Sequence, residues 1–436
     1  MKIQFTRTID VIKEVDVCVI GGGPAGCAAA YSAAMVKGIK VLLVEGTGSL
    51  GGMGTLGGVP AFTQFGDGKK FLAKGFGWTL LKNLEEAGGT YPETISNEAG
   101  QNMGIRSEVL KRVYDQMLLD SGVDISLCTQ LIDVETDGRK VCHAICAAKS
   151  GIFAIKAKRF VDCTGDGDLC VWAGAAFEKG DKDDNLMPGT LCSLFTGIDF
   201  DTVSKSGLNP RVEILKAIDD GVFSLPDLHL PGIWQLGEHI GGGNISHAFG
   251  LDGTDEKSLT HHYIDSRKRM VEYVRFYKEY LKGYENMQLI ATGALMGVRE
   301  TRRIICDMTM TLEHFKNRAS FDDEIGRYSY PIDIHISKPD AEQYKAFEKD
   351  FHENFRYAQG ESYGISYRSL IPRDLDNVLV AGRCIGSDRY FNGSVRVMAG
   401  CYITGQAAGK AEAVSIKKNI EVRKIKTAEL QLDQKH

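Results

Sequence analysis

Apolar runs and small-residue stretches alternate near both ends of the chain. Residues 15–20 and 39–45 are apolar and rich in β-branched side chains, and the alanine-rich residues 25–37 between them have the composition of a helix. Strand, tight turn, helix and strand in this order predict a βαβ unit that starts a parallel sheet. The apolar residues 377–381 and the small-residue stretch 394–414 repeat this texture, which predicts that both chain ends build one domain.

A second set of predicted elements follows the first unit. Residues 107–119 show helical spacing of apolar positions, with Ser107 as the expected N-cap. Strand-like runs then occupy residues 124–134, 141–148 and 152–161, separated by Asp-Gly and Ser-Gly turns. These runs extend the predicted sheet.

The middle of the chain has a different composition. Between residues 191 and 365 prolines, aromatic residues and histidines become more frequent, and residues 259–281 predict a strongly amphipathic helix. We therefore expect an inserted substrate or cap domain at residues 191–365, with the sheet domain divided into residues 1–190 and 366–436.

A glycine motif joins the first predicted strand to its helix. The sequence Gly-Gly-Gly-Pro-Ala-Gly at residues 21–26 fits G-x-G-x-x-G, and Glu45 ends the next strand nineteen residues after Gly26. In such a unit the glycines let the backbone approach a pyrophosphate at the helix N-terminus, and the carboxylate accepts ribose hydroxyls. The residues predicted to contact the dinucleotide are Gly21, Gly23, Pro24, Ala25, Gly26 and Glu45.

Three further motifs occur in a family-like order. They are Leu-Gly-Gly-Met-Gly-Thr at residues 50–55, Val-Asp-Cys-Thr-Gly-Asp-Gly-Asp at 161–168, and Asn-Val-Leu-Val-Ala-Gly-Arg at 377–383, the last continued by residues 393–398 and 405–409. With them the sequence resembles the FAD-dependent oxidoreductases of the glutathione-reductase-type fold, closest to a broad family distantly similar to succinate dehydrogenase and fumarate reductase flavoproteins. The resemblance covers nearly the whole chain, including parts of its middle.

The resemblance implies both a fold and a cofactor. The fold is α/β, with a Rossmann-like FAD-binding domain assembled from N- and C-terminal segments and an inserted α+β substrate or cap domain. The further residues expected to contact FAD are Gly51, Gly52, Met53, Leu131, Thr164, Gly165, Asp166, Gly382, Arg383, Gly393, Ser394, Val395 and Arg396. Some similar enzymes attach FAD through a histidine near the second glycine pair, but the first histidine here is His143, so we expect non-covalent FAD.

The small-residue stretch near the C-terminus also suggests a role in catalysis. If Ser394 caps a helix running to about Val414, the free N–H groups at that end carry a positive partial charge. Placed against the flavin pyrimidine edge, they would stabilise the negative charge of reduced flavin. Arg396 in the first turn would add to this effect, or would form a salt bridge within the flavin domain.

Candidate catalytic residues come from the middle of the chain. His335 lies in a Pro-Ile-Asp-Ile-His run whose alternation puts Asp333 and His335 on one face. Arg299 and Arg368 are the candidate cations, the latter where the cap rejoins the cofactor domain. A hydride donor needs a proton acceptor at its hydroxyl, and a carbonyl needs an acid or cation. His335, Arg368 and Arg299 are therefore the predicted catalytic residues.

Other histidines are given simpler interpretations. His247 follows a run of three glycines and is interpreted as a loop histidine, with contact to a mobile lid as the alternative. His261 and His262 are expected on the surface, because their spacing is not that of a metal pair. The sequence therefore predicts no metal site.

Composition limits the partners. Charged residues make up 25% and the net charge is −5, so no basic surface predicts nucleic-acid binding. No run approaches the roughly 20 apolar residues of a membrane span, and we expect neither a signal peptide nor a membrane partner. The eleven cysteines contain no Cys-x-x-Cys pair, which favours reduced thiols and a cytoplasmic location.

The function expected from the sequence is that of an FAD-dependent oxidoreductase. It would transfer a hydride between flavin N5 and a small polar, hydroxylated or carboxylated substrate, with an unknown electron acceptor or donor. A flavin-dependent RNA-modifying protein and a flavoprotein electron-transfer subunit are the alternatives. Self-association into a homo-oligomer stays open.

Overall fold

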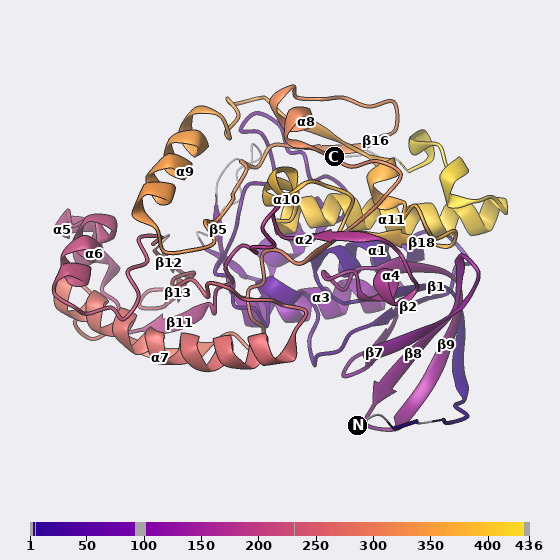
Figure 1. Cartoon of the computed structure of the whole chain (residues 1–436), viewed down its shortest axis with the longest axis horizontal. Coiled ribbons are helices and arrows are strands. Elements are labelled where there is room, and N and C mark those ends of the chain that lie inside the picture. Colours follow the sequence, from indigo (N-terminus) through magenta and orange to yellow (C-terminus); the bar gives the residue numbers. More distant parts are fainter. Residues whose placement is uncertain (1–2, 5, 92–101, 231, 431–436) are drawn as a thin grey trace.

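A seven-stranded sheet to which both chain ends contribute is the centre of the fold (Figure 1). The computed structural model describes residues 3–4, 6–91, 102–230 and 232–430. The strand order is β6-β2-β1-β9-β8-β7, with β18 also paired to β9. The strands are β1 (Val11–Ile20), β2 (Val41–Val44), β6 (Asp124–Ser126), β7 (Gln130–Asp137), β8 (Lys140–Ala148), β9 (Gly151–Asp162) and β18 (Val378–Val380).

The parallel part of this sheet joins residues far apart in sequence. Strand β1 pairs in parallel with β2 through Val17 and Val41, and β18 pairs in parallel with β9 through Leu379 and Val161. Strands β2 and β18 are buried along their whole length, as is typical of parallel strands in the interior of a sheet. The predicted βαβ unit, and the assembly of the sheet from both chain ends, are confirmed.

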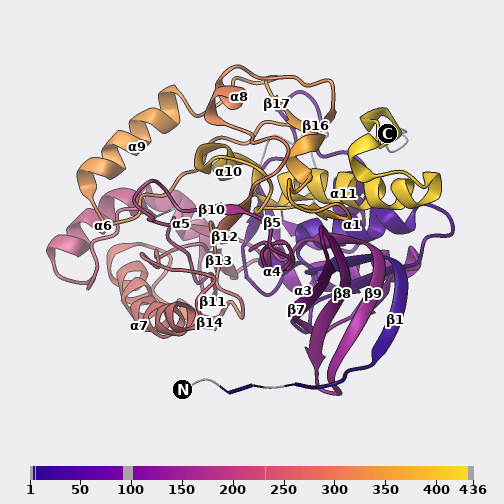
Figure 2. The same cartoon turned by 45° about the vertical axis from the view of Figure 1, so that its right-hand side comes forward.

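Helices from the two ends pack closely on each other (Figure 2). A Cβ atom at Gly405 would lie 2.1 Å from the carbonyl oxygen of Ala25, and one at Gly409 would lie 1.9 Å from that of Ala29. Only glycine allows this approach of α11 to α1. The helices of this part are α1 (Pro24–Ala34), α2 (Phe76–Glu86), α3 (Ser107–Asp120), α4 (Asp168–Trp172), α10 (Arg389–Val395) and α11 (Met398–Lys418).

Two predicted elements are divided differently in the structure. The run at residues 124–134 is two strands, β6 and β7, with Cys128 at a φ of +52° between them. The chain turns there because β6 continues the parallel sheet beside β2, whereas β7 pairs antiparallel with β8. The expected single helix at residues 394–414 is α10 and α11, separated at Arg396 and Val397.

An antiparallel four-stranded sheet lies apart from the first one in sequence and has its own apolar core. Its long helix α7 (Glu256–Tyr280) begins earlier than predicted, because the side chain of Asp255 accepts the Ser258 N–H at 2.8 Å and caps it. The strand order is β12-β13-β11-β14. The other elements here are β11 (Ser193–Thr196), β12 (Ile233–Gln235), β13 (Gly241–Gly243), β14 (Gln288–Thr292), α5 (Phe200–Ser206) and α6 (Pro210–Asp219).

Short elements connect the two regions. Strand β15 pairs with β10, and β16 pairs with β17, each antiparallel. The remaining strands are β3 (Ala61–Phe62), β4 (Thr90–Tyr91), β5 (Met103–Ile105), β10 (Phe177–Lys179), β15 (Arg302–Ile304), β16 (Glu324–Tyr328) and β17 (Tyr363–Ser366). The remaining helices are α8 (Leu312–Lys316) and α9 (Ala341–Glu353), with the 3-10 turns η1 (Gly52–Gly54), η2 (Tyr367–Leu370), η3 (Val422–Lys424) and η4 (Thr427–Glu429). Within the described chain, every helix is too short or too polar to cross a membrane.

Candidate active site

The glycine turn before α1 has one open position. A Cβ at Gly21 would lie 2.4 Å from the Cys163 carbonyl oxygen, and one at Gly26 would lie 1.7 Å from the Gly21 carbonyl oxygen. At Gly23, by contrast, no described atom lies within 4 Å of where a Cβ would stand. The first and third glycines are thus required for packing, and the second leaves space for a phosphate at the helix N-terminus.

Glu45 supports the same turn from β2. Its Oε2 accepts the Gly22 N–H at 2.6 Å and its Oε1 accepts the Thr47 N–H at 2.7 Å. A carboxylate has further lone pairs beyond these two bonds, so ribose hydroxyls can still bind there. The second glycine pair follows, with Gly51 at φ +92° and Gly52 at φ +49°. Both need the left-handed backbone conformation that glycine adopts without strain.

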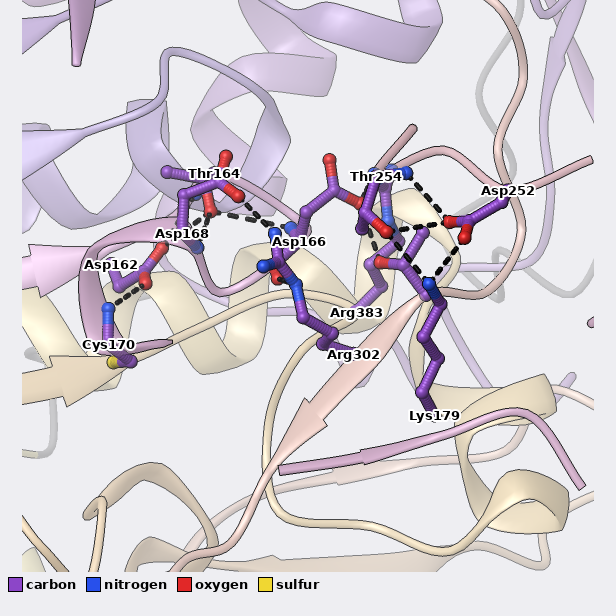
Figure 3. A network of polar contacts seen from close by, with 11 residues as sticks. Asp162, Thr164, Asp166, Asp168, Cys170, Lys179, Asp252, Thr254, Arg302 and Arg383 are labelled. Carbon is purple, nitrogen blue, oxygen red and sulfur yellow. Dashed lines mark hydrogen bonds and ion pairs between the residues drawn. The ribbon is translucent and has the colours of Figure 1, made fainter. Parts of the chain in front are cut away.

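The end of β9 is a polar junction (Figure 3). Asp162 accepts hydrogen bonds from the Thr164 hydroxyl at 2.8 Å and from the Cys170 N–H at 2.9 Å. Asp166 accepts from the Thr301 hydroxyl at 2.6 Å and from the Arg383 guanidinium at 2.7 Å. The strand end is therefore bonded to both the middle and the C-terminal parts of the chain.

Arg302 and Arg383 enclose this junction from two sides. Arg302 donates to the Asp166 carbonyl oxygen at 2.7 Å and is paired with Asp168. Gly165, at φ +81°, lies so close to Arg383 that a Cβ would stand 2.9 Å from the guanidinium carbon. The buried Nε of Arg383 has no hydrogen-bond partner among the described residues, which fits a site for an acceptor group of a bound ligand.

The C-terminal motif differs from the expectation at Ser394. Its hydroxyl lies inside α10, donates to the Tyr330 carbonyl oxygen at 2.5 Å and is bonded to the Tyr363 hydroxyl at 2.7 Å. Ser394 is therefore not a helix cap, because its side chain is fully engaged in the core. The free N-terminus belongs to α11, which follows Val397. Gly393 and Val395 lie in the same buried helix α10.

A cavity of about 530 Å³ opens beside this N-terminus. Its lining includes Met53 from the second glycine pair, and Arg383, Arg396, Val397 and Met398 from the C-terminal motif. The helix N-terminus and the arginines give this part of the wall a positive potential. The helix end at the cavity begins at Met398, four residues later than Ser394, and its position beside the flavin stays a prediction.

Polar residues from distant segments line the cavity next to Arg396. Arg299, Asp333 and His335 line the cavity together with Arg396. Arg396 donates to the Asp333 carbonyl oxygen at 2.9 Å and lies 3.3 Å from its carboxylate, and Arg299 donates to the Pro188 carbonyl oxygen at 2.6 Å. Residues 330–336 form no strand, but the predicted alternation holds, since Ile332 is buried and Asp333 and His335 both face the cavity.

Burial and neighbouring charges determine the protonation states in this wall. Burial and the charge of Arg299 lower the pKa of His335 to about 3, although Asp333 opposes this. Burial, together with Arg396, lowers the pKa of Arg299 to about 10. Burial alone would raise the pKa of Asp333, but His335, Arg396 and Arg299 hold it below its usual range. At neutral pH the wall therefore presents a neutral imidazole, a carboxylate and two cations.

Two more histidines lie behind and beside His335. His247 Nε2 lies 2.8 Å from His335 Nδ1, and His247 Nδ1 lies 3.2 Å from a carboxylate oxygen of Asp227. The ring of His229 is stacked on that of His247, with centroids 4.5 Å apart. His247 lies in a loop, as interpreted from the sequence, but it is only 2% exposed. His229 and Asp227 gave no signal in the sequence, because they have no recognisable spacing to the other residues.

Arg368 lies outside the cavity. Its side chain is 49% exposed and pairs with Asp323 at 2.9 Å. The 3-10 turn η2 directs Tyr367, Ser369 and Leu370 into the core, which leaves Arg368 pointing outward. The topological argument for Arg368 failed because proximity in sequence to the domain junction does not determine the side chain's direction.

Leu131, on β7, is buried opposite Cys146 in the sheet, and its contact with FAD stays a prediction. Two other predicted residues have surroundings different from those expected. His261 is exposed as predicted, but His262 is buried and bonds the carbonyl oxygens of Ser258 and Phe249 at 2.8 and 2.9 Å. Ser107 is the first residue of α3, after the N-cap residue Arg106.

Comparison with known proteins gives a family match across the chain. Residues 16–433 match the family described as FAD dependent oxidoreductase. No curated protein matches the sequence. A geranylgeranyl bacteriochlorophyll reductase-like protein of Thermoplasma acidophilum has 14% identity and a TM-score of 0.47, over 93% of this chain and 80% of its own. The p-nitrophenol 4-monooxygenase of Pseudomonas putida has 12% identity and a TM-score of 0.47, over 94% of this chain and 82% of its own. Such distant neighbours add nothing to the family match.

Proposed function

The chain belongs to the FAD-dependent oxidoreductase family, and we propose that it transfers a hydride between FAD and a small, hydroxylated and carboxylated substrate. The observation that carries this proposal is the cavity at the N-terminus of α11, which is lined by the buried Arg299 and the partly buried Arg396 of the C-terminal motif. Family membership confirms the predicted FAD cofactor and the predicted enzyme class. The attachment of FAD and the roles of single residues stay predictions.

The charge of the cavity supports an anionic substrate. Five of the described lining residues are arginines, and only two are carboxylates, Asp333 and Glu348. One of the arginines, Arg383, is already paired with Asp166, so an excess of positive charge remains. A buried arginine binds a carboxylate through a planar pair of N–H donors, which fixes the orientation of a small acid. A carboxylated substrate therefore suits this wall better than a neutral one.

The residues of the wall have separable tasks. Bound FAD supplies the hydride acceptor or donor at N5. Arg299 is held by the Pro188 carbonyl oxygen and would bind the carboxylate. Arg396 would hold its charge next to the reacting carbon, since Asp333 fixes its guanidinium and its Nε has no partner among the described residues. Orientation by such fixed groups lowers the barrier without further reorganisation.

The substrate hydroxyl would face the histidines. An alcohol that loses a hydride also loses its hydroxyl proton, so its oxygen needs a base or a cation beside it. Burial lowers the pKa of His335 to about 3, which makes it a weak base for that proton. A cation beside the oxygen would supply the remaining stabilisation.

Anaerobic flavin reduction tests the proposal. We expect one class in a panel of hydroxy acids, sugar acids, alcohols and neutral sugars to bleach the flavin, and the acids to act more strongly than their neutral analogues. Arg299→Gln should raise KM for the active acid by about 100-fold, since a charge-assisted pair contributes roughly 3 kcal/mol. Arg368→Gln, which removes an exposed arginine outside the cavity, should leave KM within about twofold.

Two outcomes would contradict the proposal. The first is a flavin that no donor in the panel reduces and whose reduced form no corresponding keto acid reoxidises. The second is equal loss of activity in the Arg299 and Arg368 variants, because a general effect on folding would then explain both. Flavin content and the near-UV circular dichroism of each variant separate misfolding from a change at the site.

A further inference from the structure

Three histidines from separate segments converge at the wall of the cavity. His229, His247 and His335 each present a ring nitrogen, and the three nitrogens lie within 4.8 Å of one another. His229 and His335 line the cavity, and His247 lies behind them. The ring centroids are 4.5, 4.7 and 5.0 Å apart. Three imidazoles around one ion at about 2.1 Å per nitrogen would have centroids roughly 4.6 to 5.3 Å apart.

The hydrogen-bonded row through this group needs one positive charge. Its contacts are Asp227 to His247 at 3.2 Å, His247 to His335 at 2.8 Å and His335 to Asp333 at 3.3 Å. Each contact needs one proton, because carboxylate oxygens and bare imidazole nitrogens both carry lone pairs. Two neutral imidazoles supply only two protons for three contacts. In one of the three contacts, therefore, both facing atoms carry a lone pair and repel each other unless a cation lies between them.

A single extra proton does not satisfy all three histidines. A proton between His247 and His335 would complete the row, but the buried Nε2 of His229 would still have no hydrogen-bond partner among the described residues. Three converging imidazole nitrogens are a donor set that suits a transition-metal ion.

Carboxylates stand behind two of the three rings. Asp227 lies at Nδ1 of His247, the nitrogen that faces away from the group, and it also accepts the His229 backbone N–H at 3.0 Å. Asp333 lies at Nε2 of His335, again the outer nitrogen. A carboxylate on the outer N–H fixes the tautomer and makes the inner nitrogen a stronger ligand. The two carboxylates also balance the charge of a divalent ion.

We propose that His229, His247 and His335 bind a divalent transition-metal ion, of the class of Zn²⁺ or Fe²⁺, with an open coordination position toward the cavity. The ring of His229 is within 11° of parallel to that of His247, so it turns about its side-chain torsions to bring Nε2 to the ion. The substrate hydroxyl would take the open position, where the ion would stabilise the alkoxide that is left when the hydroxyl proton passes to water and the hydride to FAD. This last role rests on the proposed function, whereas the binding of the ion does not.

Metal binding to the FAD-loaded enzyme tests this site. Enzyme freed of metal with a chelator is dialysed against Zn²⁺, and separately against Fe²⁺ without oxygen, and the metal retained per chain is measured by mass spectrometry. We expect one equivalent of at least one ion. His229→Gln and His335→Gln should each weaken binding by at least about 100-fold, and Asp227→Asn by about 10-fold. His261→Gln removes an exposed histidine and should leave binding unchanged.

The outcomes separate the metal site from the proposed function. No retention of either ion, or equal retention by the His229→Gln variant, overturns the metal site and leaves the histidines as a proton relay. Flavin bleaching by an acid donor in enzyme that binds no metal would then still support hydride transfer. Conversely, stoichiometric metal in an enzyme whose flavin no donor reduces would support the metal site and contradict the proposed function. Flavin content in every variant shows that the chain has folded.

Discussion

The packing of α1 against α11 gives the sharpest prediction about the fold. In Gly409→Ala the new Cβ would lie 1.9 Å from the Ala29 carbonyl oxygen, about 1.5 Å short of the 3.4 Å of an ordinary contact. The obstructing atom is backbone and cannot rotate away, so overpacking should cost about 3 kcal/mol, the upper end of its usual range. Alanine recovers about 1 kcal/mol of helix propensity. The net expectation is a loss of about 2 kcal/mol in the free energy of unfolding.

The same substitution should weaken FAD binding. The N-terminus of α1 provides the open position at Gly23, and the N-terminus of α11 lies at the cavity. Parting the two helices would displace both ends of the cofactor site, and we expect the Kd for FAD to rise about 10-fold or more, a loss of about 1.4 kcal/mol. Urea unfolding of the apoprotein and fluorescence titration with FAD measure the two effects.

Gly77→Ala is the matched control. Gly77 also lies in a helix, α2, but its Cβ would meet the Ala73 Cβ at an ordinary 3.4 Å. We expect the stability of this variant to stay within about 0.5 kcal/mol of the parent or to increase, because helix propensity favours alanine. If Gly409→Ala and Gly77→Ala unfold at the same urea concentration, the argument from close helix approach is wrong.

Three further predictions follow from other parts of the chain. Acid precipitation should release the FAD into the supernatant; colour retained in the pellet would contradict non-covalent binding. Burial and the charges of Asp166 and Asp162 raise the pKa of Asp168 to about 6. Its contribution to the free energy of unfolding is therefore present at low pH and is lost as the pH rises through 6. Between pH 4 and 7 the apoprotein should lose about 2 kcal/mol more of this free energy than the Asp168→Asn variant, and parallel curves for the two proteins would refute this. Thr301→Val removes the bond to Asp166 and should cost about 2 kcal/mol in urea unfolding; no loss would mean that this bond is replaced by solvent.

The cofactor domain could be predicted from the sequence because its constraints are local. Gly21 and Gly26 are glycines for reasons of contact within one turn and its neighbouring strand. Short-range patterns of this kind are visible in a single sequence. The exception was the start of the C-terminal helix. The break at Arg396 and Val397 depends on Ser394 bonding residues 330 and 363, which no local pattern encodes.

The wall of the cavity could be predicted only in part. His335 was found because a two-residue alternation set it beside Asp333, and this alternation survives in an irregular segment. His229, by contrast, is brought to His335 by tertiary packing across more than a hundred residues. A single sequence has no signal for such a meeting, and the prediction of no metal site could not take it into account.

The junction at the end of β9 should couple cofactor binding to the middle of the chain. Asp166 belongs to a cofactor motif, yet its carboxylate accepts bonds from Thr301 in the middle of the chain and from Arg383 after β18. Gly297 and Arg299, which lie four and two residues before Thr301, both line the cavity. A ligand that fixes Arg383 would therefore also fix the segment that carries Arg299, through one shared carboxylate. Binding of FAD should for this reason order the substrate wall before any substrate arrives.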